Sequence, residues 1–415
     1  MTSKFDVIVL GAGIVGLGAA MHLQQSGKGV ALVDKNDHVG RETSYGNAGL
    51  IERASIKPYM LPWEVGKLMQ YALNLSPAAH YQLRALPSIA PWILRYARNS
   101  MPANTAKIAA AARPLIEHSL SEHEALMEKA GAQNLLRRTG WIKFHRSETE
   151  FAKAVASVDE LRGYGLTIDI LSRAELMLRE PFLNAGIGAL HYKDPGFVPD
   201  PAALSQAYAN YFTSLGGTLH MGDARSLSQT RDGWQLTTEG GNITAREVVV
   251  ALGPWSTQIL APLGYNIPLG VKRGYHMHFG VRGNAVLNHP VLDNEMGYLL
   301  APMNQGIRLT TGAEFASFDA PPSPVQLAEV TPIARDAFPL AEPLDPTPWM
   351  GRRPCLPDML PIIGRAPRHP GLWLDFGHQH HGLTLSAVSG RLLTEMMTGQ
   401  TPFTNPAPYS IARFG

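Results

Sequence analysis

Hydrophobic and polar positions along this chain follow both a strand period and a helix period, which indicates a mixed fold. Residues 5–10 (FDVIVL) form a short apolar run typical of a buried strand, and residues 14–26 have the pattern of an apolar helix. Residues 28–34 (KGVALVD) predict a second strand. Farther along, apolar and polar residues alternate at 271–281 and 296–312, which predicts strands of another sheet. We therefore expect an α/β or α+β protein.

The glycines between the first strand and the first helix have the spacing G-x-G-x-x-G, as Gly11, Gly13 and Gly16. Gly11 permits a tight turn, Gly13 lets the backbone approach a pyrophosphate, and Gly16 lets the helix pack close to the strand. The helix N-terminus offers free amides to phosphates. Asp34, at the end of the second strand, can accept hydrogen bonds from ribose hydroxyls. This order predicts a dinucleotide site; the alternative is a glycine-rich turn in some other α/β fold.

Composition narrows the class of protein. The 415 residues, 45% of them hydrophobic, suggest two or three domains, and 36 Lys and Arg against 34 Asp and Glu give no basic surplus for nucleic acid. The single cysteine, Cys355, excludes an internal disulfide and a cysteine-based zinc site. The apolar stretch 7–23 is interrupted by four glycines, so we expect neither a signal peptide nor a membrane span. We expect a cytoplasmic protein, with contact at the inner face of the cell membrane as an alternative.

Five stretches resemble the FAD-dependent D-amino-acid dehydrogenase group of the D-amino-acid oxidase and glycine oxidase superfamily. They are GAGIVGLGAA at 11–20, RETSYGNAGLI at 41–51, VVVALGPWS at 248–256, GRRPCLPDMLPIIG at 351–364 and GHQHHGLTLSAVSGRLL at 377–393. The resemblance implies a Rossmann-like FAD-binding domain interleaved with a substrate domain built on an antiparallel sheet. We expect the FAD-binding domain at 1–55, 150–260 and 350–415, and the substrate domain at 56–149 and 261–349.

The loop at 39–51 carries small donors that could wrap a second phosphate or the ribityl chain, although an ordinary polar turn is the alternative. The resemblance implies that the end of the strand predicted at 218–225 lies near the adenine, and that the run at 244–255 passes close to the FAD. The expected cofactor-binding residues are Gly11, Gly13, Ile14, Val15, Gly16, Asp34, Lys35, Arg41, Thr43, Ser44, Asn47, Ala48, Gly49, Leu50, Ala224, Ala251, Gly253, Trp255, Gly377, His380, His381, Gly382, Leu383 and Thr384.

Three histidines lie within four positions of the loop GHQHHG, as His378, His380 and His381. They are too close together to converge on one ion without strain, and no second cluster of ligands is evident, so we predict no metal. A helix is predicted to follow Gly382, and its free N-terminal amides could stabilise negative charge on a reduced flavin. The resemblance implies that this stretch passes the pyrimidine end of the flavin. One histidine, His378 above all, could also line a substrate pocket; loop histidines bonded to the backbone are the alternative.

An amino-acid substrate needs a cation for its carboxylate, and the planar fork of arginine suits two oxygens. The resemblance implies that Arg353 is this clamp, whereas Arg352 is expected in a surface ion pair. Tyr275 and Tyr298, on the predicted strands, could donate to the carboxylate or close the pocket, with core packing as the alternative. Cys355 lies nearer to Pro357-Asp358 than the cysteine that holds flavin covalently in some relatives, which predicts non-covalent FAD.

The expected reaction is the FAD-dependent oxidative deamination of D-amino acids to 2-oxo acids and ammonia, by hydride transfer from Cα to flavin N5. The expected electron acceptor is a quinone or another carrier. The aromatic-rich stretch 57–102 could form a lid, a core helix, or a contact with a membrane or quinone. The alternatives are an oxidase or dehydrogenase of sarcosine, glycine, D-proline or D-hydroxyproline, a 2-hydroxy-acid oxidase, a non-catalytic FAD-binding subunit, and an NAD-dependent dehydrogenase.

Overall fold

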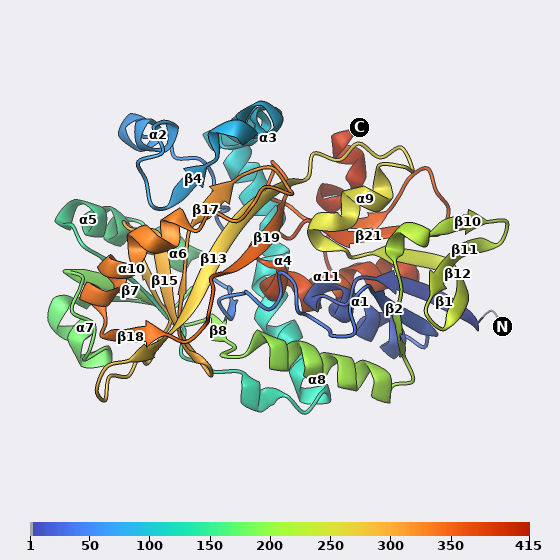
Figure 1. The fold of residues 1–415 in the computed structure, drawn as a ribbon, viewed down its shortest axis with the longest axis horizontal. Helices are drawn as coiled ribbons and strands as arrows, with labels where there is room; N and C mark the ends of the chain where they lie inside the picture. The colour runs from blue at the N-terminus through green and yellow to red at the C-terminus, as the bar shows by residue number, and fades with distance from the viewer. Residues whose placement is uncertain (1–2) are drawn as a thin grey trace.

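The computed structural model describes residues 3–415, and it contains two large sheets that lie side by side (Figure 1). The smaller sheet has eight strands, with four parallel pairings around β1, β2, β12, β9 and β21 and an antiparallel edge. Its strands are β1 (Ser3–Leu10), β2 (Val30–Asp34), β9 (Thr218–Met221), β10 (Ser228–Thr230), β11 (Gly233–Thr238), β12 (Gly241–Val250), β20 (Ile362–Arg365) and β21 (Leu372–Phe376). The strand predicted at 218–225 is thus shorter, because a 3-10 turn follows at Ala224–Ser226.

The larger sheet has eleven strands in the order β4-β17-β13-β16-β15-β14-β5-β7-β6, with β18 and β19 also paired to β13. All its pairings are antiparallel except β14 with β5 and β17 with β4. Its strands are β4 (Ala79–Tyr81), β5 (Trp141–His145), β6 (Ile168–Ser172), β7 (Gly188–Tyr192), β13 (Gly270–Val281), β14 (Val291–Asp293), β15 (Tyr298–Met303), β16 (Gly306–Thr310), β17 (Ala313–Phe315), β18 (Leu340–Pro343) and β19 (Trp349–Cys355). The short pair β3 (Leu50–Ile51) and β8 (Gly196–Phe197) lies apart from both sheets.

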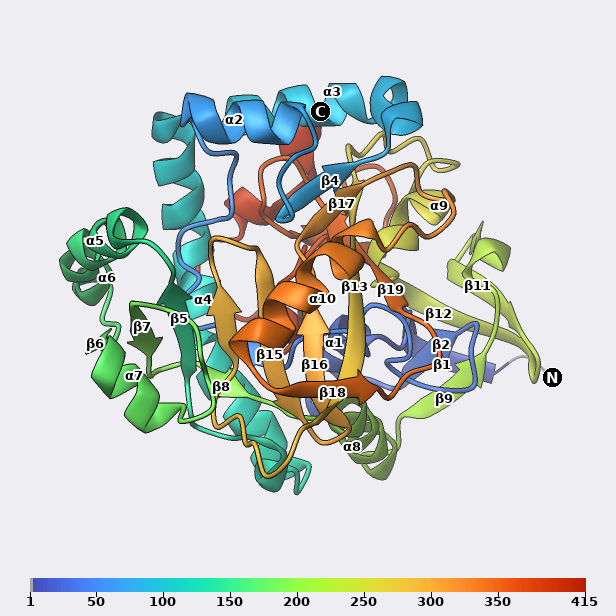
Figure 2. The same cartoon turned by 60° about the vertical axis from the view of Figure 1, so that its left-hand side comes forward.

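Helices cover the two sheets and frame the space between them (Figure 1; Figure 2). They are α1 (Ile14–Gln25), α2 (Val65–Ala72), α3 (Leu86–Asn99), α4 (Pro102–Lys129), α5 (Glu148–Ala156), α6 (Val158–Gly163), α7 (Arg173–Arg179), α8 (Pro201–Ser214), α9 (Ser256–Leu260), α10 (Val325–Ala337) and α11 (Gly382–Met397). The helix predicted at 14–26 is present and ends at Gln25. Asp200 caps α8 by accepting from the amide of Ala203, with Pro201 in the first turn.

The two ends of the chain meet where α1 crosses α11. A methyl group on Gly18 would lie 2.2 Å from the carbonyl oxygen of Ser386, and one on Gly390 would lie 2.6 Å from the backbone of Gly18. Two glycines thus let the helix axes approach closely, and Leu17, Ala20 and Val388 belong to the same buried cluster. This contact holds the N-terminal nucleotide-binding motif against the C-terminal histidine loop.

Sheet membership differs from the domain boundaries that we predicted. β6 and β7 lie in the larger sheet although 150–260 was expected in the FAD-binding domain, and β19 pairs with β13 although 350–415 was expected there too. Conversely, α4 falls within 56–149 but packs on α11, in the apolar cluster of the smaller sheet. The reason is that contacts between residues far apart in the sequence decide to which sheet each segment belongs, and the local sequence pattern does not show which segment is the partner.

Candidate active site

A cavity of about 900 Å³ lies between the two sheets and is lined by residues from both. Four parallel strands of the smaller sheet end at it, because β1, β2, β12 and β21 lead directly into Gly11, Asp34, Ala251 and Gly377, all of which line the cavity. Ligands of open parallel sheets bind at the carboxyl ends of the strands. The opposite wall comes from the larger sheet, chiefly from β13, β15, β16 and β19.

The three glycines of the N-terminal motif have different surroundings. Gly11 adopts φ +102°, and a methyl group on it would lie 2.6 Å from the carbonyl oxygen of Ala251. A methyl group on Gly16 would lie 1.8 Å from the carbonyl oxygen of Gly11, so this glycine serves helix packing and does not line the cavity. A methyl group on Gly13 would have the Ser44 hydroxyl as its nearest protein atom, at 3.5 Å. The space in front of the α1 N-terminus is therefore open for a ligand. This open cradle fits a pyrophosphate.

Asp34 stands at the end of β2, where a ribose would be bound. Its carboxylate accepts from the amide of Ala12 at 2.7 Å and from the amide of Asn36 at 3.0 Å, which fixes its orientation. A carboxylate has further lone pairs, so Asp34 can also accept from ligand hydroxyls. Beside it, the ammonium of Lys35 lies 4.8 Å from the centre of the Trp255 ring.

The loop at 41–50 is held in place by internal hydrogen bonds. The Ser44 hydroxyl accepts from the amide of Ile14 at 3.0 Å, and the Thr43 hydroxyl donates to the carbonyl of Arg352 at 2.9 Å. The buried guanidinium of Arg308 donates to the carbonyls of Tyr45 (3.1 Å) and Asn47 (2.5 Å). The loop is therefore anchored to both sheets before any ligand binds.

The histidine loop begins with Gly377 at φ +82° and ends at His381, the N-cap of α11. Nε2 of His378 lies 3.4 Å from a carboxylate oxygen of Asp375, and both side chains are buried. Burial lowers the pKa of His378 to about 3 and raises that of Asp375 well above its ordinary value, so burial disfavours the charged form of both groups. Burial likewise lowers the pKa of His381 to about 4. The loop therefore brings polar, uncharged imidazoles to the start of α11.

Arg353 is a half-buried cation on β19 that has no acidic partner within 4 Å among residues 3–415. Its guanidinium donates to the carbonyls of Gly312 at 2.9 Å and Thr311 at 3.3 Å, and it lines the cavity. A methyl group on Gly274 would lie 2.3 Å from Nη2, so the guanidinium rests on the backbone of β13. A buried charge without a counter-ion is costly. An anionic ligand would remove this cost.

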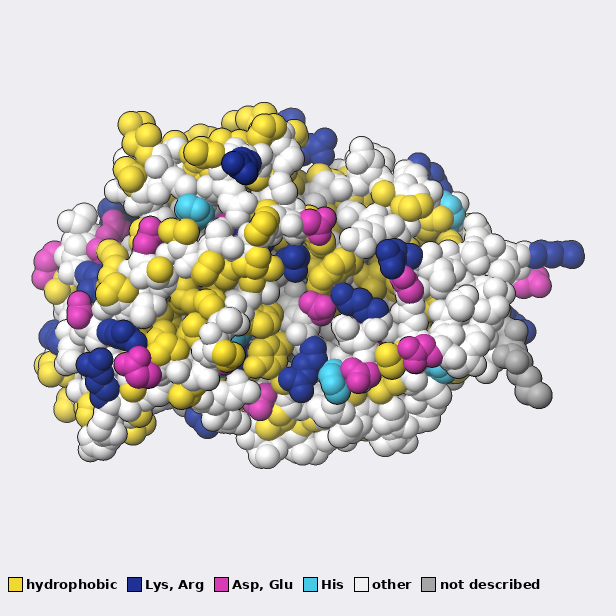
Figure 3. Space-filling model, in the orientation of Figure 1, with side chains coloured by type: hydrophobic (Ala, Val, Ile, Leu, Met, Phe, Trp, Pro, Cys, Tyr) yellow, Lys and Arg dark blue, Asp and Glu magenta, His cyan; other side chains and the backbone are white. Residues whose placement is uncertain are grey.

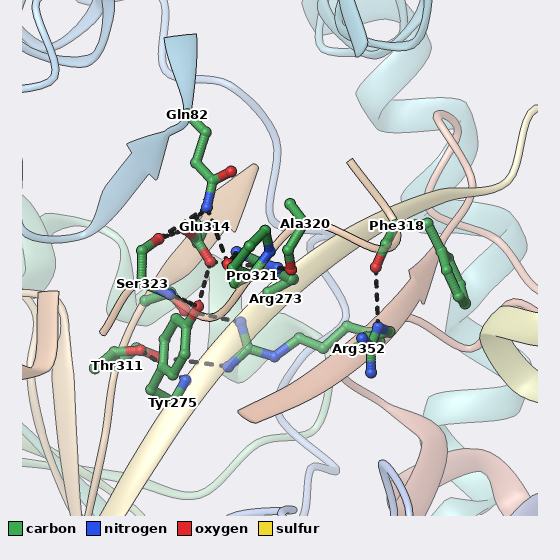
Figure 4. A network of polar contacts seen from close by, with 12 residues as sticks. Gln82, Arg273, Tyr275, Thr311, Glu314, Phe318, Ala320, Pro321, Ser323 and Arg352 are labelled. Carbon is green, nitrogen blue, oxygen red and sulfur yellow. Dashed lines mark hydrogen bonds and ion pairs between the residues drawn. The ribbon is translucent and has the colours of Figure 1, made fainter. Parts of the chain in front are cut away.

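Arg352 and Arg273 have structural partners (Figure 4). The predicted surface ion pair of Arg352 was wrong, because this side chain donates to the carbonyl of Phe318 at 3.1 Å and stacks on its ring. Arg273 forms a fully buried ion pair with Glu314 at 2.8 Å. Neither arginine lines the cavity.

Both tyrosines proposed for the substrate site have hydroxyl groups that are hydrogen-bonded to other protein groups. Tyr275 belongs to the cavity wall, but its hydroxyl donates to Glu314 at 2.6 Å and accepts from the amide of Ser323 at 2.8 Å (Figure 4). The Tyr298 side chain points into the apolar core of the larger sheet, with its hydroxyl 3.4 Å from the Arg146 guanidinium. Tyr298 is therefore a core residue, because its position on β15 has the opposite parity to Leu299, which lines the cavity.

Most of the other predicted positions come together around the cavity. The exceptions are Gly16, Gly49 and Thr384, which serve packing or hold the chain: the Thr384 hydroxyl, for example, accepts from the amide of Glu52 at 3.0 Å. The predicted residues that line the cavity are Gly11, Gly13, Ile14, Val15, Asp34, Lys35, Arg41, Thr43, Ser44, Asn47, Ala48, Leu50, Ala224, Ala251, Gly253, Trp255, Tyr275, Arg353, Gly377, His378, His380, His381, Gly382 and Leu383.

Sequence reasoning missed several residues of the cavity wall. Glu52, Trp141, His276 and Trp349 all line it, and the His276 and Trp349 rings stack with centroids 4.8 Å apart. Glu52 directly follows the stretch RETSYGNAGLI, so its position beside a predicted cofactor loop was a usable signal. The others belong to strands whose neighbours are far away in the sequence.

His276, His278 and Asp345 place ligand atoms within 4.8 Å of one another, as a metal site would. However, Nδ1 of His278 pairs with Asp345 at 2.8 Å, and its Nε2 accepts from Nε of Arg308 at 2.9 Å. Both imidazole nitrogens are thus engaged, and a guanidinium occupies the position that an ion would take. The cluster serves to hold Arg308 under the 41–50 loop.

A nucleotide cradle in one sheet and, in the other, a half-buried arginine with no acidic partner among the described residues characterise an oxidoreductase with a dinucleotide cofactor. The family of FAD dependent oxidoreductases named DAO matches residues 6–396, and the chain belongs to this family. The predicted family and the predicted mixed fold with two sheets are both confirmed. The Gly13 cradle and Asp34 fit the phosphates and ribose of FAD.

Several proteins are similar to this chain over nearly its whole length. A D-amino acid dehydrogenase of Dechloromonas aromatica is 28% identical over 411 residues, covering 95% of this chain and 97% of the relative. A D-amino-acid oxidase of Bradyrhizobium diazoefficiens is 29% identical, covering 98% of each. The fold is similar to that of glycine oxidase from Geobacillus kaustophilus (TM-score 0.74, 24% identity, 99% of each chain) and of L-amino acid deaminase from Proteus vulgaris (TM-score 0.75, 20% identity, 100% of this chain and 98% of the other).

Within residues 3–415, no helix is both long and apolar enough to cross a bilayer.

Proposed function

We propose that this protein catalyses the oxidative deamination of D-amino acids to 2-oxo acids and ammonia, with non-covalently bound FAD. The observation that carries the proposal is Arg353, a half-buried guanidinium with no acidic partner among the described residues, in the cavity that also contains the nucleotide cradle. The names of the full-length relatives, a D-amino acid dehydrogenase and a D-amino-acid oxidase, support the substrate class. An α-amino acid has the carboxylate that Arg353 would bind.

Arg353 acts by orientation. The carbonyls of Thr311 and Gly312 hold its guanidinium, so its remaining N–H groups can bind two carboxylate oxygens and fix the position of the substrate Cα. FAD held at the Gly13 cradle would supply the hydride acceptor for Cα; the lone pair of the neutral substrate amine would form the imine, which water hydrolyses to the 2-oxo acid and ammonia. The positive end of α11, at Gly382 and Leu383, provides amides that favour negative charge nearby. His378 and His381 are neutral and contribute no net charge of their own there.

Cys355 supports non-covalent binding of the cofactor. Its side chain is buried on β19, next to Arg353 but outside the cavity wall, and burial raises the pKa of its thiol. A protonated thiol that faces away from the cavity cannot form a bond to flavin. Flavin should therefore be released from the denatured protein in acid.

The surface formed by α2 and α3 is the proposed contact for the electron acceptor or a membrane. Many of its large apolar side chains are exposed, and apolar atoms gather over both helices (Figure 3). The exposed ones between residues 59 and 101 are Tyr59, Trp63, Val65, Met69, Leu73, Leu75, Leu83, Leu94 and Met101. Exposed apolar patches of this kind mark interaction sites, and a quinone in the bilayer is the acceptor that we propose.

Anaerobic mixing with a panel of D- and L-amino acids tests the proposed reaction. We expect D-enantiomers to bleach the flavin absorbance and L-enantiomers to leave it unchanged. Absence of bleaching by every D-amino acid, with reduction by sarcosine, glycine or D-proline instead, would assign the chain to an amine or imino-acid reaction. Reoxidation by a soluble quinone faster than by oxygen would support a dehydrogenase, and the reverse order an oxidase.

A further inference from the structure

The cavity extends along the larger sheet well beyond Arg353. His276, Thr310, Leu299 and Leu292 lie directly opposite one another on β13, β16, β15 and β14, and all four line the cavity. The next strand in this row is β5, which contributes Trp141 to the wall. The Arg353 guanidinium lies at the β13 end, beside Gly274 and Thr311.

Glu52 lies on the β5 side of the cavity, where Lys143 of β5 and Tyr192 of β7 are within electrostatic range of its carboxyl group. Its side chain is buried and lines the cavity, and its backbone amide is fixed by the Thr384 hydroxyl at 3.0 Å. The carboxyl accepts one hydrogen bond, from the Ser55 hydroxyl. Within the part of the chain that is described, no arginine, lysine or histidine lies within 4 Å of the Glu52 carboxyl group. The ammonium of Lys143 on β5 attracts this carboxyl group electrostatically from farther away. The electrostatic attraction of the Lys143 ammonium to Glu150 is stronger than its attraction to Glu52.

We propose that Glu52 determines the substrate class by binding a cationic group at the far end of the amino-acid side chain. The inference rests on the proposed function, because it takes Arg353 as the site of the substrate carboxylate. In an α-amino acid the amine and the carboxyl group are both attached to Cα. When the carboxylate is bound by Arg353, the α-amine therefore lies beside it and cannot also reach the β5 end of the wall. A long side chain that ends in an ammonium or guanidinium group can reach it. The substrates are therefore basic amino acids of the lysine, ornithine or arginine type.

Electrostatic complementarity supports this assignment. The cavity then holds a half-buried cation at one end and a buried carboxyl group at the other, each with few partners of its own. A zwitterion extended between them would neutralise both and make charge-assisted hydrogen bonds at each end. Apolar Leu292 and Leu299, between the two ends, suit the methylene groups of such a side chain.

Binding of two unreactive carboxylates to the FAD-loaded protein tests the proposal, with the perturbed flavin spectrum as the readout. 6-Aminohexanoate carries a carboxylate and a distal ammonium, whereas hexanoate lacks the ammonium, and neither has a 2-amino group to oxidise. We expect the wild-type protein to bind 6-aminohexanoate at least tenfold more tightly than hexanoate. Glu52→Gln should abolish this preference while its hexanoate affinity and FAD content stay within about twofold. The matched control Glu160→Gln changes an exposed carboxyl that pairs with Lys57 and should keep the preference.

Three results would overturn the role of Glu52. They are a wild-type protein without preference, a preference that survives in Glu52→Gln, and an equal loss of both affinities in that variant. If neither carboxylate binds, the proposed clamp at Arg353 is wrong, and hexylamine against hexanol then decides the role of Glu52 by the same comparison. Because no turnover is needed, these results are separate from any failure of D-amino acids to reduce the flavin. In turnover, D-lysine should exceed D-norleucine in kcat/KM by tenfold or more, and Glu52→Gln should remove the difference.

Discussion

Polar side chains in this molecule differ mainly in whether other protein groups already provide their hydrogen-bond and ion-pair partners. Arg273 and Arg353 lie on neighbouring strands, Arg273 buried and Arg353 half-buried, yet Arg273 has Glu314 as its partner and Arg353 has two backbone carbonyls. Tyr275 is likewise satisfied by Glu314 and Ser323. Arg353 and Glu52 lack an oppositely charged protein partner within 4 Å among the described residues, so they can bind charged groups of a ligand. This contrast follows from the cost of burying unpaired charge.

Replacement of Arg353 should damage substrate binding without loss of the cofactor. Charge-assisted hydrogen bonds contribute about 1.5–3 kcal/mol each, so Arg353→Ala should lower kcat/KM by about 10²–10⁴, mostly through KM. Arg352→Ala removes a guanidinium one residue away that faces Phe318, so it is the matched control and should change kcat/KM less than threefold. Steady-state kinetics and the flavin-to-protein ratio measure both effects. An unchanged KM in Arg353→Ala would contradict the clamp.

The preference for a distal cation should depend on pH. Burial raises the pKa of Glu52 to about 7, with the Ser55 hydroxyl and the Lys143 ammonium opposing that shift; Tyr59 and Tyr192 are the other ionisable groups around it. Below pH 7 the free carboxyl is protonated and loses its attraction for a cation. The ratio of the 6-aminohexanoate affinity to the hexanoate affinity should therefore rise between pH 6 and pH 8. Titrations at these pH values check it, and a flat or falling ratio would count against an ionised Glu52.

Among the helices, the crossing of α1 and α11 matters most for the site. It joins the N-terminus of α1, where the phosphates are expected, to the start of α11, where the histidine loop ends. The crossing is close because Gly18 and Gly390 face each other without side chains. The pattern of small residues at 11–20 and 386–390 indicated apolar helices, but not that these two helices meet.

Gly390→Ala should force the two helices apart, because its methyl group would lie 2.6 Å from the backbone of Gly18. Overpacking of this kind costs about 1–3 kcal/mol, so we expect a lower Tm and weaker retention of FAD. The control Gly66→Ala places a methyl group on exposed α2 with no atom within 4 Å, and should leave Tm unchanged or slightly raised. Differential scanning calorimetry gives both values. Equal Tm values for Gly390→Ala and wild type would show that the crossing can relax.

At the scale of the whole molecule, the cavity is shared by both sheets, and the cofactor should stabilise them together. A ligand that binds only the folded protein stabilises it by about 2.7 kcal/mol at 100 times its Kd. Removal of FAD should therefore lower Tm, and its readdition should restore Tm in a concentration-dependent way. AMP, which can bind only the nucleotide half, is the control and should restore less. A Tm that FAD does not change would contradict a cofactor site between the sheets.

The local pattern alone determined the N-terminal βαβ unit, the open cradle at Gly13, the position of Asp34 and the C-terminal helix that follows the histidine loop. These features depend on residues close together in the sequence, whose spacing and backbone requirements can be read directly. Resemblance then indicated Arg353. Tertiary structure alone decided that Tyr298 faces the core, that Arg273 is neutralised by Glu314, that β6, β7 and β19 join the larger sheet, and that Glu52 faces Arg353 across one cavity. Each of these depends on strand register or on a partner dozens to hundreds of residues away, and burial decides which charges stay unpaired only after those strands have met.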